Sequence, residues 1–181
     1  MEEIQSFLNR KGEEITLRPA EPDDAEGIIK ALKSAAPERS YVLMEQFGKD
    51  IKAEREYISK LSRSNNLLLV GIAGDNRIIG ILEAIQSDGG QRPETAHVLN
   101  IGLHLMVDFR GLGIGSRMMQ YTEEWAREHQ FRELETSVFT TNKRSLNLFR
   151  KAGFLNECTK VKRIRIGNEF VDEVVIGKWL D

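Results

Sequence analysis

The stretch HVLNIGLHLMVDFRGLGIGSRMM, residues 97–119, decides the fold. The apolar run 96–107 predicts a strand, and apolar residues spaced from Ile114 to His129 predict a helix. Glycines at positions 111, 113 and 115 fill the junction. Glycine leaves no Cβ between backbone and ligand, and the first turn of a helix offers free N–H groups at its positive dipole end. This stretch therefore predicts a phosphate-binding loop, with Arg110 adding a positive charge.

The spacing of these glycines distinguishes between three known phosphate-binding motifs. A P-loop would end in Gly-Lys-Ser/Thr, but Gly115-Ser116 is followed by Arg117. A dinucleotide fingerprint would place its third glycine where Ser116 stands, and Glu135 could then serve as the ribose-binding acid. That fingerprint normally opens a first βαβ unit, whereas here a hairpin closes the chain. A nucleotide-binding oxidoreductase fragment is therefore a less favoured alternative to the third pattern, Arg/Gln-x-x-Gly-x-Gly/Ala.

The rest of the chain predicts a mixed α/β fold with antiparallel pairs at both ends. A proline ends the first expected strand, Asp23 or Asp24 caps the first expected helix, and Gly153 follows the last one. Residues 1–12 form an N-terminal extension to a single domain, residues 13–181. Residues 35–48 show no regular pattern, and residues 87–94 predict a loop. We expect further strands at 15–19, 67–73, 78–85, 134–139, 161–166 and 170–179, and helices from 23, at 49–61 and at 142–152.

Composition excludes several functional classes. The chain has 181 residues with a net charge of −2, which gives no electrostatic reason to expect nucleic acid or a membrane surface as a partner. Its one cysteine, Cys158, permits no internal disulfide, and the scattered histidines show no metal-binding spacing. We expect no metal. Since no apolar run is long enough to span a membrane and the N-terminus lacks a signal-peptide pattern, we expect a cytoplasmic protein.

Four segments in the same order resemble the GNAT superfamily of N-acetyltransferases. The segment 97–119 resembles its fourth strand and coenzyme loop, and NKRSLNLFRKAGF (142–154) resembles its Asn-containing helix. ITLRPAEPDDA (15–25) is similar to the opening strand and helix, and GNEFVDEVVIGKWL (167–180) to a closing strand. The resemblance implies a mixed, mostly antiparallel sheet of about seven strands flanked by helices. It also implies acetyl-CoA as cosubstrate.

The resemblance assigns roles to particular residues. The backbone of Leu103 and Leu105 would pair with the pantetheine arm, and Asn142 would contact it near the thioester. A plain helix N-cap is the alternative role for Asn142, and the two roles are compatible. Arg150 or Lys143 would meet the coenzyme phosphates. The pyrophosphate would be held by the backbone of Arg110, Gly111, Leu112, Gly113, Ile114, Gly115 and Ser116.

The amine must lose a proton before it attacks the thioester directly, which calls for a base. The position where some family members carry a glutamate is Leu99 here, so the candidate bases are Glu83 and His97, with His104 third. A backbone N–H near Leu105 would stabilise the oxyanion. Phe149 replaces the tyrosine that frequently acts as acid beside the coenzyme.

The expected activity is therefore transfer of acetyl from acetyl-CoA to a primary amine. The acceptor is a small molecule, an amino acid or a peptide or protein N-terminus, and specificity would depend on the loops 35–48, 87–94 and 167–168. The departures at Leu99 and Phe149 keep a non-catalytic acyl-CoA sensor of the same fold as the alternative. Dimers are common in similar proteins, so the resemblance is compatible with a homodimer.

Overall fold

A computed structural model of the chain describes residues 3–34, 50–61 and 65–181. Eight strands form one sheet in the order β1-β2-β3-β4-β5-β6-β8-β7, and the pair β5–β6 is parallel while all the others are antiparallel. The strands are β1 Gln5–Leu8, β2 Glu14–Pro19, β3 Asn66–Ala73, β4 Ile78–Gln86, β5 Val98–Leu105, β6 Glu133–Phe139, β7 Leu155–Ile166 and β8 Glu169–Trp179.

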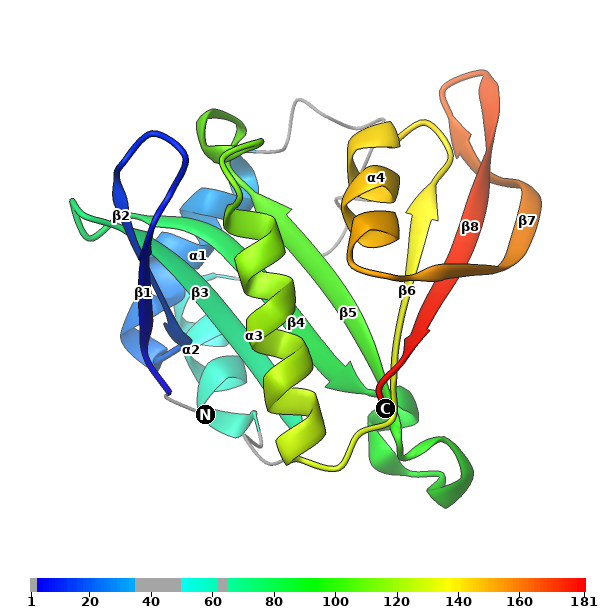
Figure 1. The fold of residues 1–181 in the computed structure, drawn as a ribbon, viewed down its shortest axis with the longest axis horizontal. Helices are drawn as coiled ribbons and strands as arrows, with labels where there is room; N and C mark the ends of the chain where they lie inside the picture. The colour runs from blue at the N-terminus through cyan, green and yellow to red at the C-terminus, as the bar shows by residue number, and fades with distance from the viewer. Residues whose placement is uncertain (1–2, 35–49, 62–64) are drawn as a thin grey trace.

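Four α-helices cover the two faces of this sheet (Figure 1). Helix α3 crosses one face and α4 lies beside it, while α1 and α2 lie behind the opposite face. Short 3₁₀ turns connect several elements. The helices are α1 Ala25–Lys33, α2 Ile51–Lys60, α3 Ile114–Glu128 and α4 Lys143–Lys151, and the turns are η1 Pro22–Asp24, η3 Ser87–Gly90, η4 Pro93–Thr95 and η5 Val107–Phe109.

Each face of the sheet has its own apolar core, because alternate strand residues point to opposite sides. On the α3 face, strand residues such as Leu82, Leu99 and Leu134 are fully buried against helix residues that include Met118. On the other face, Ile28 of α1 and Ile58 of α2 pack against β3 and β4. Among the described residues, no helix is both long and apolar enough to cross a membrane.

The expected mixed α/β architecture, mostly antiparallel, is confirmed, and both predicted hairpins are present as β3–β4 and β7–β8. The sheet has eight strands rather than about seven, since β1 within residues 1–12 pairs with β2. Strand β7 also begins at Leu155, earlier than expected. The segment 87–94, expected as a loop, contains η3 and η4, while the unpatterned residues 35–48 lie outside the described residues.

Local chemistry explains the helix starts only in part. Asp50 and Asn142 cap α2 and α4, each accepting a hydrogen bond from a backbone N–H three residues on. Asp24 occupies the N-cap position of α1, but its side chain makes no cap bond. Its carboxylate instead accepts two bonds from the guanidinium of Arg18, at 2.6 and 2.8 Å. Asp24 therefore ties α1 to β2.

Candidate active site

The sheet opens between its two parallel strands. Strands β5 and β6 pair only through Val98–Asn100 and Glu133–Glu135, although β5 continues to Leu105 and β6 to Phe139. Each strand remains paired along its length on its other side, β5 with β4 and β6 with β8. In Figure 1 the two strands meet at one end and diverge toward the end where α3 and α4 begin. The gap has the shape in which an extended ligand can lie as an added strand.

The glycine loop lies at the wide end of this gap. Gly111 and Gly113 have positive φ angles of 76° and 90°, which L side chains rarely adopt. Gly115 allows α3 to sit directly on β5, because a Cβ there would approach Leu103 and Leu105 of β5 to 3.4 Å. Gly111 and Gly113 thus allow the bend of the loop, and Gly115 allows the close contact between α3 and β5.

The loop leaves its amides available. Within the described part of the chain, none of the backbone N–H groups of residues 111–116 donates to a protein acceptor, whereas the N–H of Arg117 bonds to the carbonyl of Gly113. A Cβ built on Gly111 would meet nothing within 4 Å, so the space beside it is open. Arg110 turns toward the strand and donates through Nε to the carbonyl of Leu105 at 2.8 Å. These free amides fit an anion such as a diphosphate.

Helix α4 begins at the same end as α3 (Figure 1). Neither helix has an acidic residue in its first turn, and α4 begins with Lys143 and Arg144. The N-terminus of a helix is the positive end of its dipole, and no carboxylate in the first turn of α3 or α4 offsets it. The N-termini of these two helices therefore favour a bound anion. Lys178 of β8 joins the helices, donating to Glu123 of α3 at 2.7 Å and to the carbonyl of Ala152 at 2.6 Å.

The residues of α4 and its N-cap that were expected to contact the coenzyme lie at different positions along the helix. Asn142 is half-buried and its side-chain oxygen accepts from the N–H of Ser145, so it acts as an N-cap. Phe149 is buried, and its ring contacts Phe154 edge-on at 5.1 Å between centroids. Arg150 lies in the last turn and donates to Asn147 at 2.7 Å. Lys143, in the first turn, is therefore closer than Arg150 to the end of α4 that meets the gap.

Glu83 is the candidate base that lies beside the gap. It stands on β4 directly opposite Gly102 of β5, on the face away from α3. Its carboxylate accepts a short hydrogen bond from the hydroxyl of Tyr57 on α2. Burial, together with the adjacent Glu83 carboxylate, raises the pKa of Tyr57, so its phenol keeps its proton at neutral pH. Of the residues that the structure describes, none comes within 4 Å of a Cβ built on Gly102, so none of them fills the space next to Glu83.

The two candidate histidines differ in position: His97 lies before β5, whereas His104 lies on β5 two residues beyond Gly102 and on the same face. His97 precedes β5 at the narrow end of the gap, where its ring stacks on Trp179 at 5.7 Å between centroids. Its Nε2 is 4.0 Å from a carboxylate oxygen of Glu133. His104 points to the face of α1 and its Nε2 is 3.0 Å from the carbonyl of Ala31. The structure therefore brings Glu83, and not His97, beside the open part of β5.

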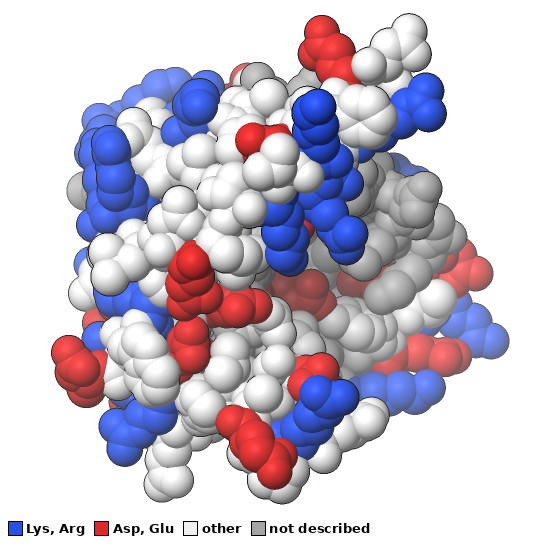
Figure 2. Space-filling view, turned by 90° about the vertical axis from the view of Figure 1, so that its right-hand side faces the viewer, with Lys and Arg blue, Asp and Glu red and all other residues white. Residues whose placement is uncertain are grey.

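Carboxylates collect on the face of β6 away from α3. Glu133 and Glu135 share that face, and both Glu133 and Glu157 approach Gly177 of β8. Burial, followed by the charge of Glu157, raises the pKa of Glu133. Figure 2 shows a hollow on this side of the molecule, with acidic side chains inside it and basic side chains along its upper border. In the described residues, no group of three or more His, Cys, Asp or Glu could hold a metal ion.

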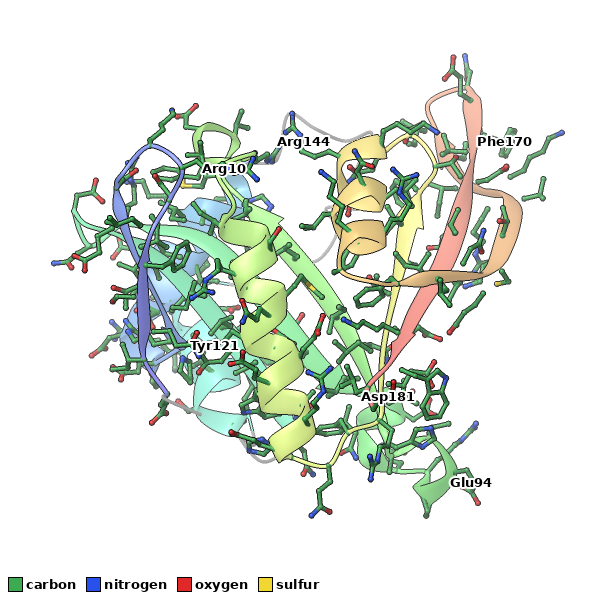
Figure 3. The ribbon with its side chains drawn as sticks, viewed as in Figure 1. Arg10, Glu94, Tyr121, Arg144, Phe170 and Asp181 are labelled. Atoms are coloured by element: carbon green, nitrogen blue, oxygen red, sulfur yellow. The ribbon has the colours of Figure 1, made fainter. Side chains whose placement is uncertain are left out.

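Two residues of the site were not anticipated from the sequence. One is Tyr57, which lies 26 positions from Glu83 in the chain and meets it only in the fold. The other is Arg10, whose backbone and side chain both bond to the glycine loop. Figure 3 shows Arg10 beside the loop, at the same end of the molecule as Arg144 of α4. The positive charge of Arg10 was the only available signal, and surface arginines are common.

Comparison with known proteins agrees with this architecture. The family model of the acetyltransferase (GNAT) family matches residues 30–154, which is more than half of the chain. The chain therefore belongs to the GNAT family and is an acetyltransferase, and members of this family use acetyl-CoA as the acetyl donor.

Individual relatives are distant in sequence but similar over nearly their whole length. YokL, a prophage SPbeta-derived uncharacterized N-acetyltransferase of Bacillus subtilis strain 168, is 24% identical over 169 residues, covering 92% of this chain and 90% of that protein. A GNAT-family acetyltransferase from Streptococcus pneumoniae superposes with a TM-score of 0.84 at 23% identity, covering 92% of this chain and 99% of its own. The structure of yncA from Salmonella typhimurium with its cofactor acetyl-CoA has a TM-score of 0.82 at 14% identity, covering 92% and 94%.

Proposed function

We propose that this protein transfers the acetyl group of acetyl-CoA to a primary amine by direct attack of the amine on the thioester. The observation that carries the proposal is the set of available amides at residues 111–116, at the wide end of the gap between β5 and β6. These amides hold the coenzyme diphosphate, and the pantetheine arm follows the backbone of Leu103 and Leu105 into the gap. The acceptor is a small molecule, an amino acid or a peptide N-terminus.

The narrowing of the gap supports one position for the thioester in this proposal. An arm paired with Leu103 cannot pass Asn100, because from that residue on β6 already occupies the neighbouring position. The thioester therefore lies level with Gly102, which is opposite Glu83. His97 lies three residues beyond Asn100, on the closed side. Position therefore favours Glu83 over His97, and His104, whose Nε2 is 3.0 Å from the carbonyl of Ala31, stays the third candidate.

Glu83 accepts the proton that the ammonium must lose before attack. Because Gly102 has no side chain, a water molecule can bridge the carboxylate and the amine across β5. The hydroxyl of Tyr57 holds the carboxylate in place through its hydrogen bond. The attacking nitrogen bonds to the carbonyl carbon, and an N–H near Leu105 stabilises the oxyanion. The C–S bond then breaks to release the thiolate of coenzyme A, which takes up the second proton that the nitrogen loses on becoming an amide. The pKa of a thiol, about 8.5, makes the thiolate an adequate leaving group without a tyrosine at Phe149.

The carboxylates near β6 suit a cationic acceptor. Glu83, Glu133 and Glu135 all lie on the sheet face away from α3, at the side from which the amine would approach. A protonated amine is attracted there before it loses its proton. These carboxylates would attract most strongly an acceptor that carries a second positive charge.

Titration with acetyl-CoA, followed by a screen of amines for release of free coenzyme A, tests the proposal. We expect binding without any acceptor and turnover only with a primary amine. Absence of measurable acetyl-CoA binding would overturn the proposal as a whole. Binding without turnover on any amine, amino acid or peptide would instead favour the acyl-CoA sensor.

Replacing Gly102 separates the coenzyme site from the proton route. Val at position 102 would put a side chain into the open space opposite Glu83. Since valine also favours strand backbone, the thermal midpoint should not fall. We expect Gly102→Val to lower kcat at least tenfold while its acetyl-CoA affinity stays unchanged. An unchanged kcat would show that the proton does not pass over this residue.

A further inference from the structure

The N-terminal hairpin meets the coenzyme loop at Arg10. The backbone N–H of Arg10 donates to the carbonyl of Leu112 at 3.2 Å, and its Nη1 donates to the carbonyl of Gly111 at 3.3 Å. Among the described residues, and apart from the chain neighbours of Gly113, the Nε and Cγ of Arg10 are the only atoms within 4 Å of a Cβ built on Gly113. The guanidinium therefore lies directly against the loop whose amides are available.

The turn that carries Arg10 is held rigidly. Asn9 is 5% exposed, and its side-chain oxygen accepts from the N–H groups of Lys11 and Glu13 at 2.8 and 3.2 Å. The Asn9 N–H in turn bonds to the Glu13 carbonyl at 2.8 Å, and Gly12 closes the turn with a φ of 80°. A buried asparagine with its hydrogen bonds satisfied thus fixes the position of its exposed neighbour.

The strand before this turn is fastened along α3. The ring of Phe7 packs against the core on that face and lies 5.2 Å from the guanidinium carbon of Arg117. At the other end of the strand, the hydroxyl of Tyr121 donates to the carbonyl of Glu3 at 2.9 Å. Phe7 of β1 and Glu3 just before it thus both contact α3, which holds the hairpin against this helix.

The charge of Arg10 is not neutralised by the protein. No described carboxylate lies within ion-pairing distance of it, and its one side-chain bond, to Gly111, leaves most of its five N–H donors unused. Arg144 of α4 stands at the same end of the molecule (Figure 3). An exposed guanidinium with its donors beside a phosphate loop is arranged to form forked, charge-assisted bonds to phosphate oxygens.

We propose that Arg10 binds a phosphate group of the coenzyme, so that the N-terminal hairpin completes the coenzyme site. This inference depends on the proposed function, which supplies the coenzyme. The diphosphate and the 3′-phosphate of the coenzyme offer the same chemistry, and dephospho-coenzyme A, which lacks the 3′-phosphate, distinguishes them. Residues 1–12 thereby take part in coenzyme binding as well as in the sheet.

The test is a calorimetric titration of the full chain with coenzyme A and with dephospho-coenzyme A, at low and at high salt. Arg10→Ala should weaken coenzyme A binding about tenfold at low salt, since a charge-assisted bond is lost, and the difference should shrink at high salt. Arg10→Lys, which keeps the charge but not the fork, should lose less affinity than Arg10→Ala. Lys11→Ala, in the same turn, is the matched control and should bind normally. An equal loss for both ligands places the contact at the diphosphate, and a loss confined to coenzyme A places it at the 3′-phosphate.

Arg10→Gln separates ligand binding from a purely structural role. A glutamine amide can still donate to the Gly111 carbonyl but carries no charge. If Arg10→Gln binds coenzyme A as tightly as the unchanged protein, the bond to the loop is what matters, and the inference is wrong. It is also wrong if Arg10→Ala binds normally or if its loss persists undiminished at high salt. Absence of binding by the unchanged protein would overturn the proposed function itself.

Discussion

Replacing Gly113 by alanine tests whether the glycine loop holds the coenzyme. Gly113 has φ 90° and ψ −10° at the N-cap of α3, so an L residue there is strained by about 1–2 kcal/mol. Its Cβ would meet no protein atom closer than 3.9 Å, so no steric clash adds to that cost. In a domain of this size, 1 kcal/mol lowers the melting temperature by about 2–4 °C. Gly113→Ala should therefore fold, with a melting temperature lower by about 2–8 °C.

The effect of Gly113→Ala on coenzyme binding should be larger than its effect on stability. The methyl group would stand beside Arg10, next to the amides of the first turn of α3, where a phosphate must approach. Hydrogen bonds to a charged group contribute about 1.5–3 kcal/mol, which corresponds to a loss of about 10- to 100-fold in coenzyme A affinity. Isothermal titration calorimetry at one temperature, well below both melting points, measures this loss.

Gly89 provides the matched control for this variant. It also has a positive φ, 62°, with nothing within 4 Å of a built Cβ, and it lies in η3 at the opposite end of the molecule from the loop. Gly89→Ala should lower the melting temperature by a few degrees and leave coenzyme A affinity unchanged. If Gly113→Ala binds coenzyme A within twofold of the unchanged protein, the loop does not hold the phosphates and the reasoning fails.

Three further variants test the site and its electrostatics. Glu83→Gln should lower kcat about 10²- to 10⁴-fold with unchanged acetyl-CoA affinity, and a normal kcat would assign the base elsewhere. The pKa of Asp24 is lowered overall, because burial raises it but the hydrogen bonds from Arg18 and from the N–H of Glu21, with the charge of Arg18, together lower it more. Asp24→Asn should therefore cost about 1–2 kcal/mol at pH 7. In thermal melts that difference should begin to shrink near about pH 4 and disappear only below the lowered pKa of the folded state. Glu133, whose pKa is raised by burial and by Glu157, is destabilising when ionised. Glu133→Gln should therefore raise the melting temperature by about 1–2 °C at pH 7 and not below about pH 4, and a lower midpoint at pH 7 would contradict this.

Features that depend on neighbours in sequence were predictable. The glycine loop followed from three glycines between a strand pattern and a helix pattern, and two of these glycines do have positive φ. Asn142 was proposed as a helix N-cap from its residue type alone, and its side chain bonds to the N–H of Ser145. The closing hairpin was visible because Gly167, with φ 61°, separates two strand-like runs. In each case the signal and the structure lie within a few residues of one another.

Features that depend on distant pairing were not predictable. The four residues of β1 have no strong strand pattern, and they form a strand because β2 pairs with them and α3 covers Phe7. Glu83 was a candidate base from the sequence, but its partner Tyr57, which reaches it from α2 across 26 positions of the chain, was not anticipated. His97 was a candidate because it precedes the central strand, but the direction of β5 places it at the narrow end of the gap. Which end of a strand faces a ligand is decided by the whole sheet.

The brief pairing of β5 with β6 has a mechanical consequence. Among the described residues, three residue pairs form the only strand-to-strand link between a five-stranded part, β1 to β5, and a three-stranded part, β6, β8 and β7. The two parts also share the apolar core on the α3 face, so movement when the gap is empty should be greatest at its wide end, where β5 and β6 are unpaired. A ligand lying along β5 would reduce this movement. Amide hydrogen exchange in residues 101–105 and 136–139 should therefore slow when coenzyme A binds.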